Sequence, residues 1–225
     1  TESKSDESPV TVADRECERT ILQVINEAFP EDGYLGEEGA DSGAPQNGRR
    51  WIIDPIDGTR DFVRHVPLWS HLIGLEVNGE VVVGVCLMPL LGDMYFAAKG
   101  LGAYRNDTRI RCSHKSELNE SLLCANQLGG WAAHRLGGDL LAWASKFWGV
   151  RSLGGCLDAM LVASGRAEVW IEPKLQPWDM AGPRIILEEA GAKFWNLDGK
   201  SSIYTKDVVA FSPELEPHIR AFLRV

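Results

Sequence analysis

An apolar stretch that ends abruptly in two carboxylates constrains the fold of this chain more than any other feature. The segment Trp51-Ile-Ile-Asp54-Pro-Ile-Asp57-Gly-Thr59 passes from apolar residues to two acids, a glycine and a hydroxyl. Like charges at the mouth of a buried strand repel each other unless a positive charge lies between them. Because carboxylate oxygens are good ligands for Mg²⁺, the segment predicts that Asp54 and Asp57 together bind divalent cations.

The two acids can face one site only if the chain leaves the regular strand between them. Residues three positions apart lie on opposite faces of a β-strand, but Pro55 breaks the pleat and turns the chain. Such a turn brings both carboxylates and the intervening carbonyl group of Ile56 around one point. An isolated Asp-Pro-x-Asp sequence would instead predict a simple turn in which Asp57 caps a helix.

The two residues after the second acid are suited to an anion. Gly58 permits a close approach of the backbone to a ligand, and its N–H group is available to a phosphate. Thr59 adds a hydroxyl group and an amide at an expected helix start, where anions bind readily. Together with a cation site, these residues predict metal-assisted hydrolysis of a phosphate ester.

Two further acidic segments are candidates for the same site. Glu37 and Glu38 lie in a glycine-flanked loop before the Asp54 strand. One of them is a candidate metal bridge, although adjacent acids in such a loop are usually solvated. Asp179 follows Pro177-Trp178 at the start of an apolar helix, where an acid complements the helix dipole. A buried acid at that position needs a partner, and a cation would supply one.

Three other residues are secondary candidates. Asp14, three residues after Thr11, has the spacing of a helix capping box and is also a candidate ligand for a third metal. Lys4 is either a solvated charge or a phosphate ligand. Glu172 ends an apolar strand before Pro173, so it is either a residue of the rim or a contact to the substrate.

Composition limits the classes of partner. The chain has 225 residues, 44% of them hydrophobic, which is enough to bury a sizeable core. Its net charge of −9 argues against nucleic acids and anionic membrane surfaces as partners. No apolar run approaches the roughly 20 residues that span a bilayer, and no apolar secretory segment begins the chain. We therefore expect a cytoplasmic protein.

Several other catalytic classes lack their motifs in this sequence. The histidines do not have H-E-x-x-H spacing, and no G-x-x-x-x-G-K-[ST] phosphate loop or G-x-S-x-G elbow is present. The cysteines are scattered among apolar residues without a Cys-x-x-Cys pair, so we expect reduced thiols in the core. The five are Cys17, Cys86, Cys112, Cys124 and Cys156. Oxygen ligands and a metal-activated water are the remaining means of catalysis.

The order of the expected elements predicts layered α/β structure. The capping box at Thr11 begins a helix that ends before Pro30, and Asn78-Gly79 and Asn106-Asp107 predict tight turns. The expected strands of the first half are Trp51–Ile53, Leu72–Val77, Val81–Leu87, Met94–Ala97 and Ala103–Arg105. The expected strands of the second half are Leu122–Ala125, Val150–Leu153, Val169–Ile171, Ala192–Trp195 and Val208–Phe211. The expected helices there are Ala132–Phe147, Cys156–Ala163, Pro177–Ala190 and Pro213–Leu223.

We expect these elements to form one domain over residues 1–225. Residues 1–120 would form a half with an antiparallel sheet and the metal site, and residues 121–225 a half in which helices and strands alternate.

Five motifs in this order resemble the inositol monophosphatase superfamily, and together they extend over nearly the whole chain. They are Ser8-Pro-Val-Thr11-Val-Ala-Asp14, Gly36-Glu37-Glu38, Asp54-Pro-Ile-Asp57-Gly-Thr59, Trp178-Asp179-Met-Ala181 and Glu189-Ala-Gly191. The resemblance implies an αβαβα sandwich of the inositol monophosphatase and fructose-1,6-bisphosphatase type. It also implies a homodimer. The amino-terminal helix typical of the family is absent from the sequence.

The resemblance assigns roles to the candidate residues. Two Mg²⁺ ions would be bound by a set of oxygen ligands, and a third, weaker one would lie near Asp14. Gly58 and Thr59 would hold the phosphate, and Glu37 with Thr59 would orient the attacking water. The ligands of the two ions would be Glu37, Asp54, Asp57, Asp179 and the Ile56 carbonyl.

The substrate that the resemblance implies is a small phosphorylated metabolite. The segments Phe62-Val-Arg64-His-Val-Pro67-Leu-Trp69 and Glu172-Pro-Lys-Leu-Gln-Pro-Trp178-Asp179 are similar to the histidinol-phosphate phosphatase branch. In that branch, Glu172 would suit the ammonium group of the substrate; in the inositol branch it would accept hydroxyl groups. Asp61 departs from the Asn that often occupies this position, which weakens the assignment to a branch.

Histidinol phosphate is therefore the first expectation and inositol 1-phosphate the second. Fructose 1,6-bisphosphate and 3′-phosphoadenosine nucleotides are further alternatives. A metal-binding regulatory homologue without turnover is the alternative that is not an enzyme, and the presence of every proposed ligand argues against it.

Overall fold

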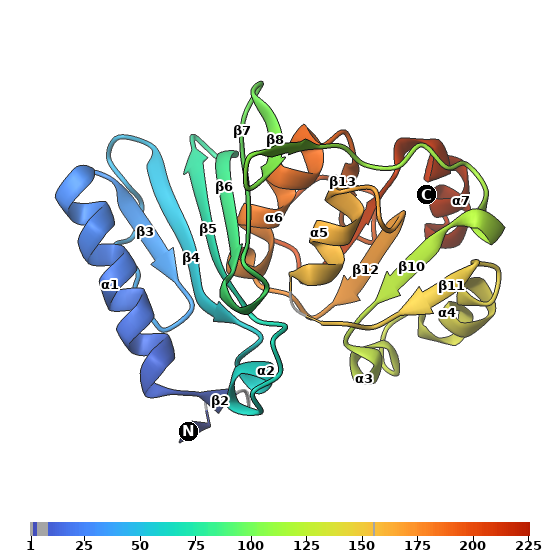
Figure 1. Ribbon diagram of the computed structural model, residues 1–225, viewed down its shortest axis with the longest axis horizontal. Coiled ribbons are helices and arrows are strands. Elements are labelled where there is room, and N and C mark those ends of the chain that lie inside the picture. The colour runs from blue at the N-terminus through green and yellow to red at the C-terminus, as the bar shows by residue number, and fades with distance from the viewer. Residues whose placement is uncertain (1, 4–8, 155) are drawn as a thin grey trace.

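The chain folds into five alternating layers of helices and sheets. The computed structural model describes residues 2–3, 9–154 and 156–225. Helix α1 (Val12–Ala28) covers one face of a seven-stranded sheet (Figure 1). Helices α5 (Leu157–Ala163) and α6 (Pro177–Glu189) lie between this sheet and a five-stranded sheet. Helices α4 (Gly137–Ala144) and α7 (Glu216–Leu223) cover the far side of the second sheet. The αβαβα arrangement expected from the sequence is confirmed.

The seven-stranded sheet is built from neighbours in the sequence. Its order is β3-β4-β5-β6-β7-β8-β9, in which β3 and β4 are parallel and every later pair is antiparallel. Its strands are β3 (Gly33–Gly36), β4 (Arg49–Asp57), β5 (Ser70–Val77), β6 (Glu80–Met88), β7 (Asp93–Ala98), β8 (Gly102–Arg105) and β9 (Thr108–Ile110).

The five-stranded sheet is mixed. Its order is β11-β10-β12-β14-β13, with parallel pairs on the β11 side and antiparallel pairs on the β13 side. Its strands are β10 (Leu122–Ala125), β11 (Gly149–Arg151), β12 (Val169–Pro173), β13 (Lys193–Trp195) and β14 (Asp207–Phe211).

Short elements complete the described part of the chain. Two of them, α2 and α3, border the cavity described below. They are β1 (Glu2–Ser3), β2 (Pro9–Val10), α2 (Thr59–Val63), α3 (Leu128–Trp131) and the 3₁₀ turns Pro89–Leu91, Leu118–Glu120 and Pro213–Leu215.

The turn and capping signals of the sequence are confirmed. Thr11 and Asp14 form a reciprocal capping box at the start of α1. Asn78 and Gly79 join β5 to β6 with φ angles of 51° and 84°, the left-handed pair that a type I′ hairpin requires. Asn106, with φ of 51°, begins the two-residue turn between β8 and β9, in which only this first residue is left-handed.

The helix expected over Ala132–Phe147 is wrong. Two short helices, α3 and α4, stand in its place, and the chain turns sharply between them. At Gly137 a Cβ atom would lie only 1.8 Å from the carbonyl oxygen of Trp131, whose side chain is buried. The apolar periodicity therefore continues across a bend that only a glycine can make. The strand expected at Val150–Leu153 is the shorter β11, and β3 and β9 were not expected.

Two apolar cores hold the layers together. One fills the central layer around α5 and α6, and the other lies between the second sheet and α4 and α7. Strand β12 contributes to both, because Trp170 faces the central core whereas Val169 and Ile171 face the outer one. Strands buried on both faces in this way are typical of parallel pairs in α/β folds.

Glycines bring α6 into close contact with the seven-stranded sheet. A Cβ atom on Gly74 of β5 would lie 2.6 Å from the Cβ atom of Ala181. One on Gly84 of β6 would lie 2.4 Å from the carbonyl oxygen of Gly182, and one on Gly182 would lie 2.9 Å from that of Val85. The helix and sheet backbones therefore touch, and α6 is fixed against β5 and β6 at Ala181 and Gly182.

This contact predicts a specific sensitivity to one methyl group. Gly84→Ala should lower the free energy of unfolding by about 1–3 kcal/mol, because α6 must move away from the sheet. Urea denaturation measures the change. Gly138→Ala in α4 is the matched control, since nothing lies within 4 Å of its Cβ position, and it should leave stability unchanged or raise it by up to about 1 kcal/mol. Equal losses in the two variants would contradict this account of the packing.

Candidate functional site

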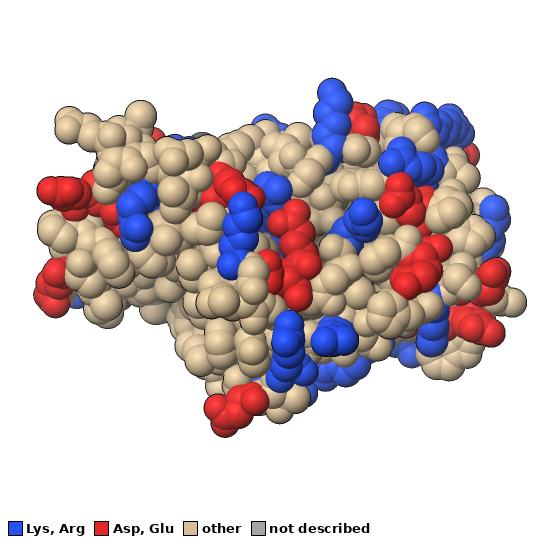
Figure 2. Space-filling view, turned by 90° about the horizontal axis from the view of Figure 1, so that it is seen from above, with Lys and Arg blue, Asp and Glu red and all other residues tan. Residues whose placement is uncertain are grey.

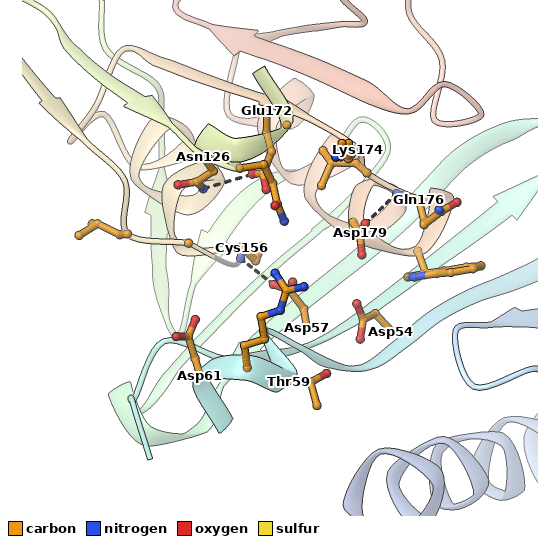
Figure 3. A pocket seen from close by; sticks show the side chains of 18 of the residues that line it. Asp54, Asp57, Thr59, Asp61, Asn126, Cys156, Glu172, Lys174, Gln176 and Asp179 are labelled. Carbon is orange, nitrogen blue, oxygen red and sulfur yellow. Dashed lines mark hydrogen bonds between the residues drawn. The ribbon is translucent and has the colours of Figure 1, made fainter. Parts of the chain in front are cut away.

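A cavity of about 1000 Å³ opens where the two sheets and the central helices meet. Its lining comes from the loop after β3, the end of β4, the start of α2, the segments after β10 and β11, the end of β12 and the start of α6. Figure 3 shows these side chains converging from both sheets. The residues that form one site are thus more than a hundred positions apart in the sequence.

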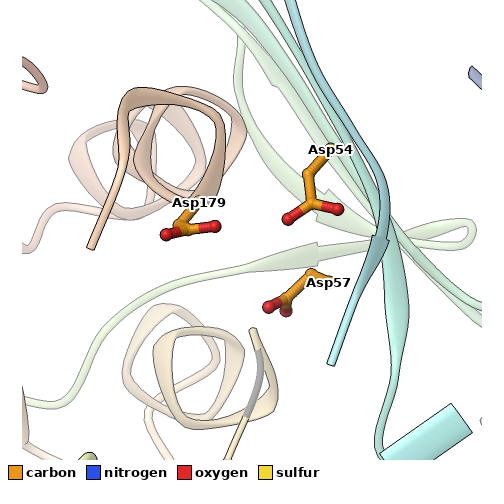
Figure 4. A group of neighbouring side chains, drawn as sticks. All are labelled: Asp54, Asp57 and Asp179. Atoms are coloured by element: carbon orange, nitrogen blue, oxygen red, sulfur yellow. The ribbon is translucent and has the colours of Figure 1, made fainter. Parts of the chain in front are cut away.

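Three carboxylates form the centre of this cavity. Asp54, Asp57 and Asp179 each offer one oxygen, and these oxygens all lie within 4.8 Å of one another. Figure 4 shows the first two on β4 and the third on α6, directed toward one another. Glu37, one residue beyond β3, also lines the cavity, whereas its neighbour Glu38 is not among the lining residues.

A β-bulge explains how two acids three positions apart face the same side. Asp54 is opposite Leu72 and Asp57 is opposite Ser70, so β4 contains one residue more than β5 in this interval. An extra residue reverses the alternation of side chains beyond it. Asp54 and Asp57 therefore share a face that a regular strand would deny them.

Two of the three acids, Asp57 and Asp179, are oriented by hydrogen bonds to one of their oxygens. Asp57 Oδ2 accepts a hydrogen bond from the backbone N–H of Cys156 at 2.7 Å and one from Ser70 Oγ at 3.2 Å. Asp179 Oδ2 accepts the backbone N–H of Gln176 at 2.7 Å and so caps its own helix. Helix capping and a role in the cluster are therefore compatible for Asp179, because the cap hydrogen bond occupies only one of its two oxygens.

Burial and mutual repulsion raise the pKa values of all three acids. Desolvation is the largest cause that raises the pKa of Asp54 well above its usual value, and the negative charges of Glu37, Asp57 and Asp179 raise it further. Desolvation raises the pKa of Asp57 to about 6, although its hydrogen bonds act in the opposite direction. The pKa of Asp179 rises to about 8 through desolvation and the charge of Asp57. Without a cation, the cluster retains protons near neutral pH.

The donor set fits a hard divalent cation. Asp54 Oδ1 is buried and makes no hydrogen bond within the described residues, which is unfavourable for a carboxylate oxygen unless an ion or water occupies the space beside it. The converging atoms are all carboxylate oxygens, the ligand type that suits Mg²⁺.

Thr59 connects the cluster to the amino-terminal helix. Its hydroxyl group lies 3.1 Å from Asp14 Oδ1 and 3.2 Å from the carbonyl oxygen of Ile56, and donates to one of them at a time. The other carboxylate oxygen of Asp14 accepts the backbone N–H of Thr11 at 2.8 Å. Asp14 is fully buried, so it serves as a cap and as a partner of Thr59 simultaneously.

Gly58 makes the turn from β4 into α2. Its φ of 87° lies in the left-handed region, and a Cβ atom there would lie 3.2 Å from the carbonyl oxygen of Leu68. Both facts favour glycine at this position. Helix α2 has only five residues, so its dipole adds little to anion binding.

Glu172 lies across the cavity in a polar network that sequence reasoning did not identify. Its Oε2 atom accepts the indole N–H of Trp170 at 3.0 Å and an amide N–H of Asn126 at 3.1 Å. Ser152 Oγ donates to Asn126 Oδ1 at 3.0 Å, which fixes the orientation of that amide. Desolvation raises the pKa of Glu172 to about 8. Asn126 directly follows a buried apolar strand, as Asp54 follows Ile53, and this position is the signal that could have identified it.

The remaining candidates are placed as follows. Lys4 lies outside the described residues. The backbone N–H of Glu38 donates to Glu18 Oε2 at 2.9 Å, so this residue takes part in fixing the loop after β3. Asp61 lines the cavity near Gly154, and burial raises its pKa.

None of the helices in the described ranges has the length and apolar character needed to cross a membrane.

Comparison with known proteins gives consistent matches over the whole fold. The model of the inositol monophosphatase family matches residues 1–223. A histidinol-phosphatase of Chlorobaculum parvum is 43% identical over 89% of this chain and 77% of its own length. A histidinol-phosphatase of Mycobacterium tuberculosis is 38% identical over 93% of this chain and 82% of its own. Human inositol monophosphatase 1 is 33% identical over 84% of this chain and 72% of its own length.

Solved structures agree with these matches. The IMPase of Thermotoga maritima superimposes with a TM-score of 0.89 and 30% identity, covering 98% of this chain and 85% of that protein. The inositol monophosphatase of Anabaena gives a TM-score of 0.88 and 32% identity, covering 96% and 87%. Sequence and architecture lead to the same conclusion: the chain belongs to the inositol monophosphatase family.

Proposed function

We propose that this phosphatase is a Mg²⁺-dependent phosphomonoesterase whose substrate is histidinol phosphate. The observation that carries the proposal is the buried group of three aspartates, whose oxygens lie within 4.8 Å of one another. Such a group is too costly to keep ionised unless cations neutralise it. Membership of a phosphatase family supports the reaction class, and the names of two of the most similar relatives support the choice of substrate.

The proposed cation ligands are the residues whose oxygens face the cluster. They are Glu37, Asp54, Asp57, Asp179 and the carbonyl group of Ile56, with Asp14 close to a third, weaker position. Divalent ions there would polarise the phosphoryl oxygens, lower the pKa of water and stabilise the leaving alkoxide. Two or three ions per site are compatible with this number of oxygens.

The residues around the cluster would position the reactants. Thr59 directs its hydroxyl proton to Asp14 or to the Ile56 carbonyl, so a lone pair on Oγ remains free to accept a hydrogen bond from the attacking water. Glu37 is the proposed acceptor of the proton that this water loses. The amide groups of Gly58 and Thr59 would hold the phosphate, with its ester oxygen directed toward the open part of the cavity.

Glu172 would select the alcohol part of the substrate. Its Oε2 atom is engaged by Trp170 and Asn126, so Oε1 is the oxygen left to accept a hydrogen bond from an ammonium group. Inositol 1-phosphate is the second candidate, because the same carboxylate can accept hydroxyl groups and because human inositol monophosphatase 1 is 33% identical. A homodimer and a cytoplasmic location remain predictions.

A substrate panel tests the assignment directly. With Mg²⁺ present, the purified protein should release phosphate from histidinol phosphate with the highest kcat/KM. Inositol 1-phosphate, fructose 1,6-bisphosphate and a 3′-phosphoadenosine nucleotide are the comparison substrates. EDTA should abolish release from all of them. Equal rates on histidinol phosphate and on a generic ester would disprove the substrate, and phosphate release that persists in EDTA would disprove the metal dependence.

Removing one ligand charge should affect catalysis and metal binding together. Asp57→Asn should lower kcat by more than about 100-fold and remove the increase in Tm that Mg²⁺ gives to the unmodified protein. Asp107→Asn, in the exposed turn between β8 and β9, is the control with the same change of charge and should retain both properties. A variant at position 57 that kept its turnover would rule out the proposed site.

The raised pKa values predict that the stability of the metal-free protein falls as the pH rises, whereas the stabilisation by Mg²⁺ grows. Asp57 and Asp179, with pKa values of about 6 and 8, bind more protons in the folded metal-free protein than in the unfolded chain. Their contribution to stability is therefore largest at low pH and is lost as the pH rises through 6 to 8. Mg²⁺ binds the deprotonated acids, so the increase in Tm caused by Mg²⁺ should grow over the same range.

Thermal unfolding in EDTA and in Mg²⁺, from pH 5.5 to 8.5, measures both curves. A gain in Tm from Mg²⁺ that does not change with pH would contradict the proton-retaining cluster.

A further inference from the structure

We propose that Lys174 and Lys206 bind the phosphate dianion transiently at the mouth of the cavity and guide it to the carboxylate cluster. This inference rests on the proposed phosphatase function. It concerns how an acidic protein admits an anionic substrate. The net charge of −9, which includes the acids of the cluster, repels a dianion, so the entrance needs a local positive potential.

Both lysines are exposed, line the cavity and form no ion pair with a described residue. Two other lysines are paired, since Lys99 lies 2.6 Å from Glu80 and Lys115 lies 3.6 Å from Glu168. Lys146, Lys193 and Lys200 also form no ion pair with a described residue, but they do not line the cavity. Elsewhere, Lys and Arg side chains are interspersed with Asp and Glu on the face seen in Figure 2. The ammonium groups at the cavity are therefore available to an anion that comes from solvent.

The backbone of Lys174 is held in an unfavourable conformation. Its φ of 64° lies in the left-handed region, which side chains with a Cβ atom rarely adopt. The strand end is fixed there because the N–H of Leu175 donates to the carbonyl oxygen of Lys206 at 2.9 Å. A glycine would adopt this conformation without strain, so the backbone conformation alone does not favour a lysine here.

The lysine stem is also supported by its surroundings. A Cβ atom placed on Gly130 of α3 would lie 3.2 Å from Lys174 Cδ and 3.4 Å from its Cε. The aliphatic part of the side chain thus lies along the backbone of α3, which requires a small residue at position 130. Figure 3 shows Lys174 between Glu172 and Gln176 on the wall of the cavity. Its position is built by the fold, unlike that of a freely solvated lysine.

The acidic residues of the cavity favour the phosphate group, and not a second anionic group of the substrate, as the ligand of the two lysines. A second anionic group on the alcohol part of a substrate would lie near Glu172, which also lines the cavity, and this acid would disfavour it. The phosphate dianion, in contrast, must enter from solvent, and the lysines would bind it only transiently before it reaches the carboxylate cluster. Screening limits such an effect to about 10 Å at 0.1 M salt, so only cations that line the cavity contribute. Arg60 lines it as well, at the start of α2, whereas the two lysines lie on the opposite wall near Glu172 and Gln176.

The test compares two variants of equal charge. Lys174→Gln with Lys206→Gln and, as the control, Lys146→Gln with Lys193→Gln each remove two positive charges, which changes the net charge from −9 to −11. Lys146 and Lys193 are exposed and do not line the cavity. For the cavity variant, we expect kcat/KM to fall by about tenfold or more on every phosphomonoester and its dependence on salt to flatten. We expect kcat to change much less.

A glycine variant separates guidance from structure. Lys174→Gly removes both the charge and the backbone strain, so its Tm should equal or exceed that of the unmodified protein. Its kcat/KM should nevertheless fall as in Lys174→Gln, and Lys174→Arg should restore most of it. A glycine variant with undiminished kcat/KM would assign Lys174 a structural role and overturn the proposal.

Two other outcomes would also overturn it. The first is a cavity variant that behaves as the control pair does over the whole range of salt. The second is a loss confined to substrates whose alcohol part carries a second anionic group, which would place the lysines at the alcohol and not at the phosphate. The unmodified protein with Mg²⁺ tests the proposed function independently, because failure of every ester there would disprove the function and not the role of the lysines.

Discussion

The contact between α6 and the seven-stranded sheet is the constraint on which the rest of the structure depends. Gly74, Gly84 and Gly182 remove the side chains that would separate the helix from the strands. This contact carries Asp179 to the end of β4, where Asp54 and Asp57 lie. A spacing set by ordinary side chains would leave the third carboxylate out of reach of the other two. The glycines therefore serve the chemistry through the packing of the central layer.

The site concentrates acidic side chains in a region where packing has removed much of the solvent. The acids gain orientation from Cys156, Ser70 and Gln176, but these bonds offset only part of the desolvation, so the pKa values stay high. The protein pairs this unfavourable centre with a cavity open to ions and substrate. The buried acids destabilise the fold locally, as is common at functional sites. The two apolar cores on either side of the second sheet compensate for this loss of stability.

Local signals explain what the sequence could predict. The capping box at Thr11, the Asn78-Gly79 turn and the acids that follow the Trp51 strand depend on neighbours within a few positions, and each was found. The helix expected at Ala132–Phe147 failed because its interruption depends on the contact of Gly137 with the Trp131 carbonyl, which no periodicity reports. Asn126 and Lys174 were missed because their roles exist only after β10 and β12 lie side by side.

Asp179 is both the cap of α6 and a member of the carboxylate cluster, and this double duty limits how the site can diverge. A longer acid there would keep the charge but place its carboxylate differently relative to the N–H of Gln176, so the start of the helix and the geometry of the cluster would change together. Glu37 lies in a loop and carries no such helix. The carboxylate cluster should therefore tolerate substitution first at the loop, whereas the helix position stays fixed by the architecture it supports.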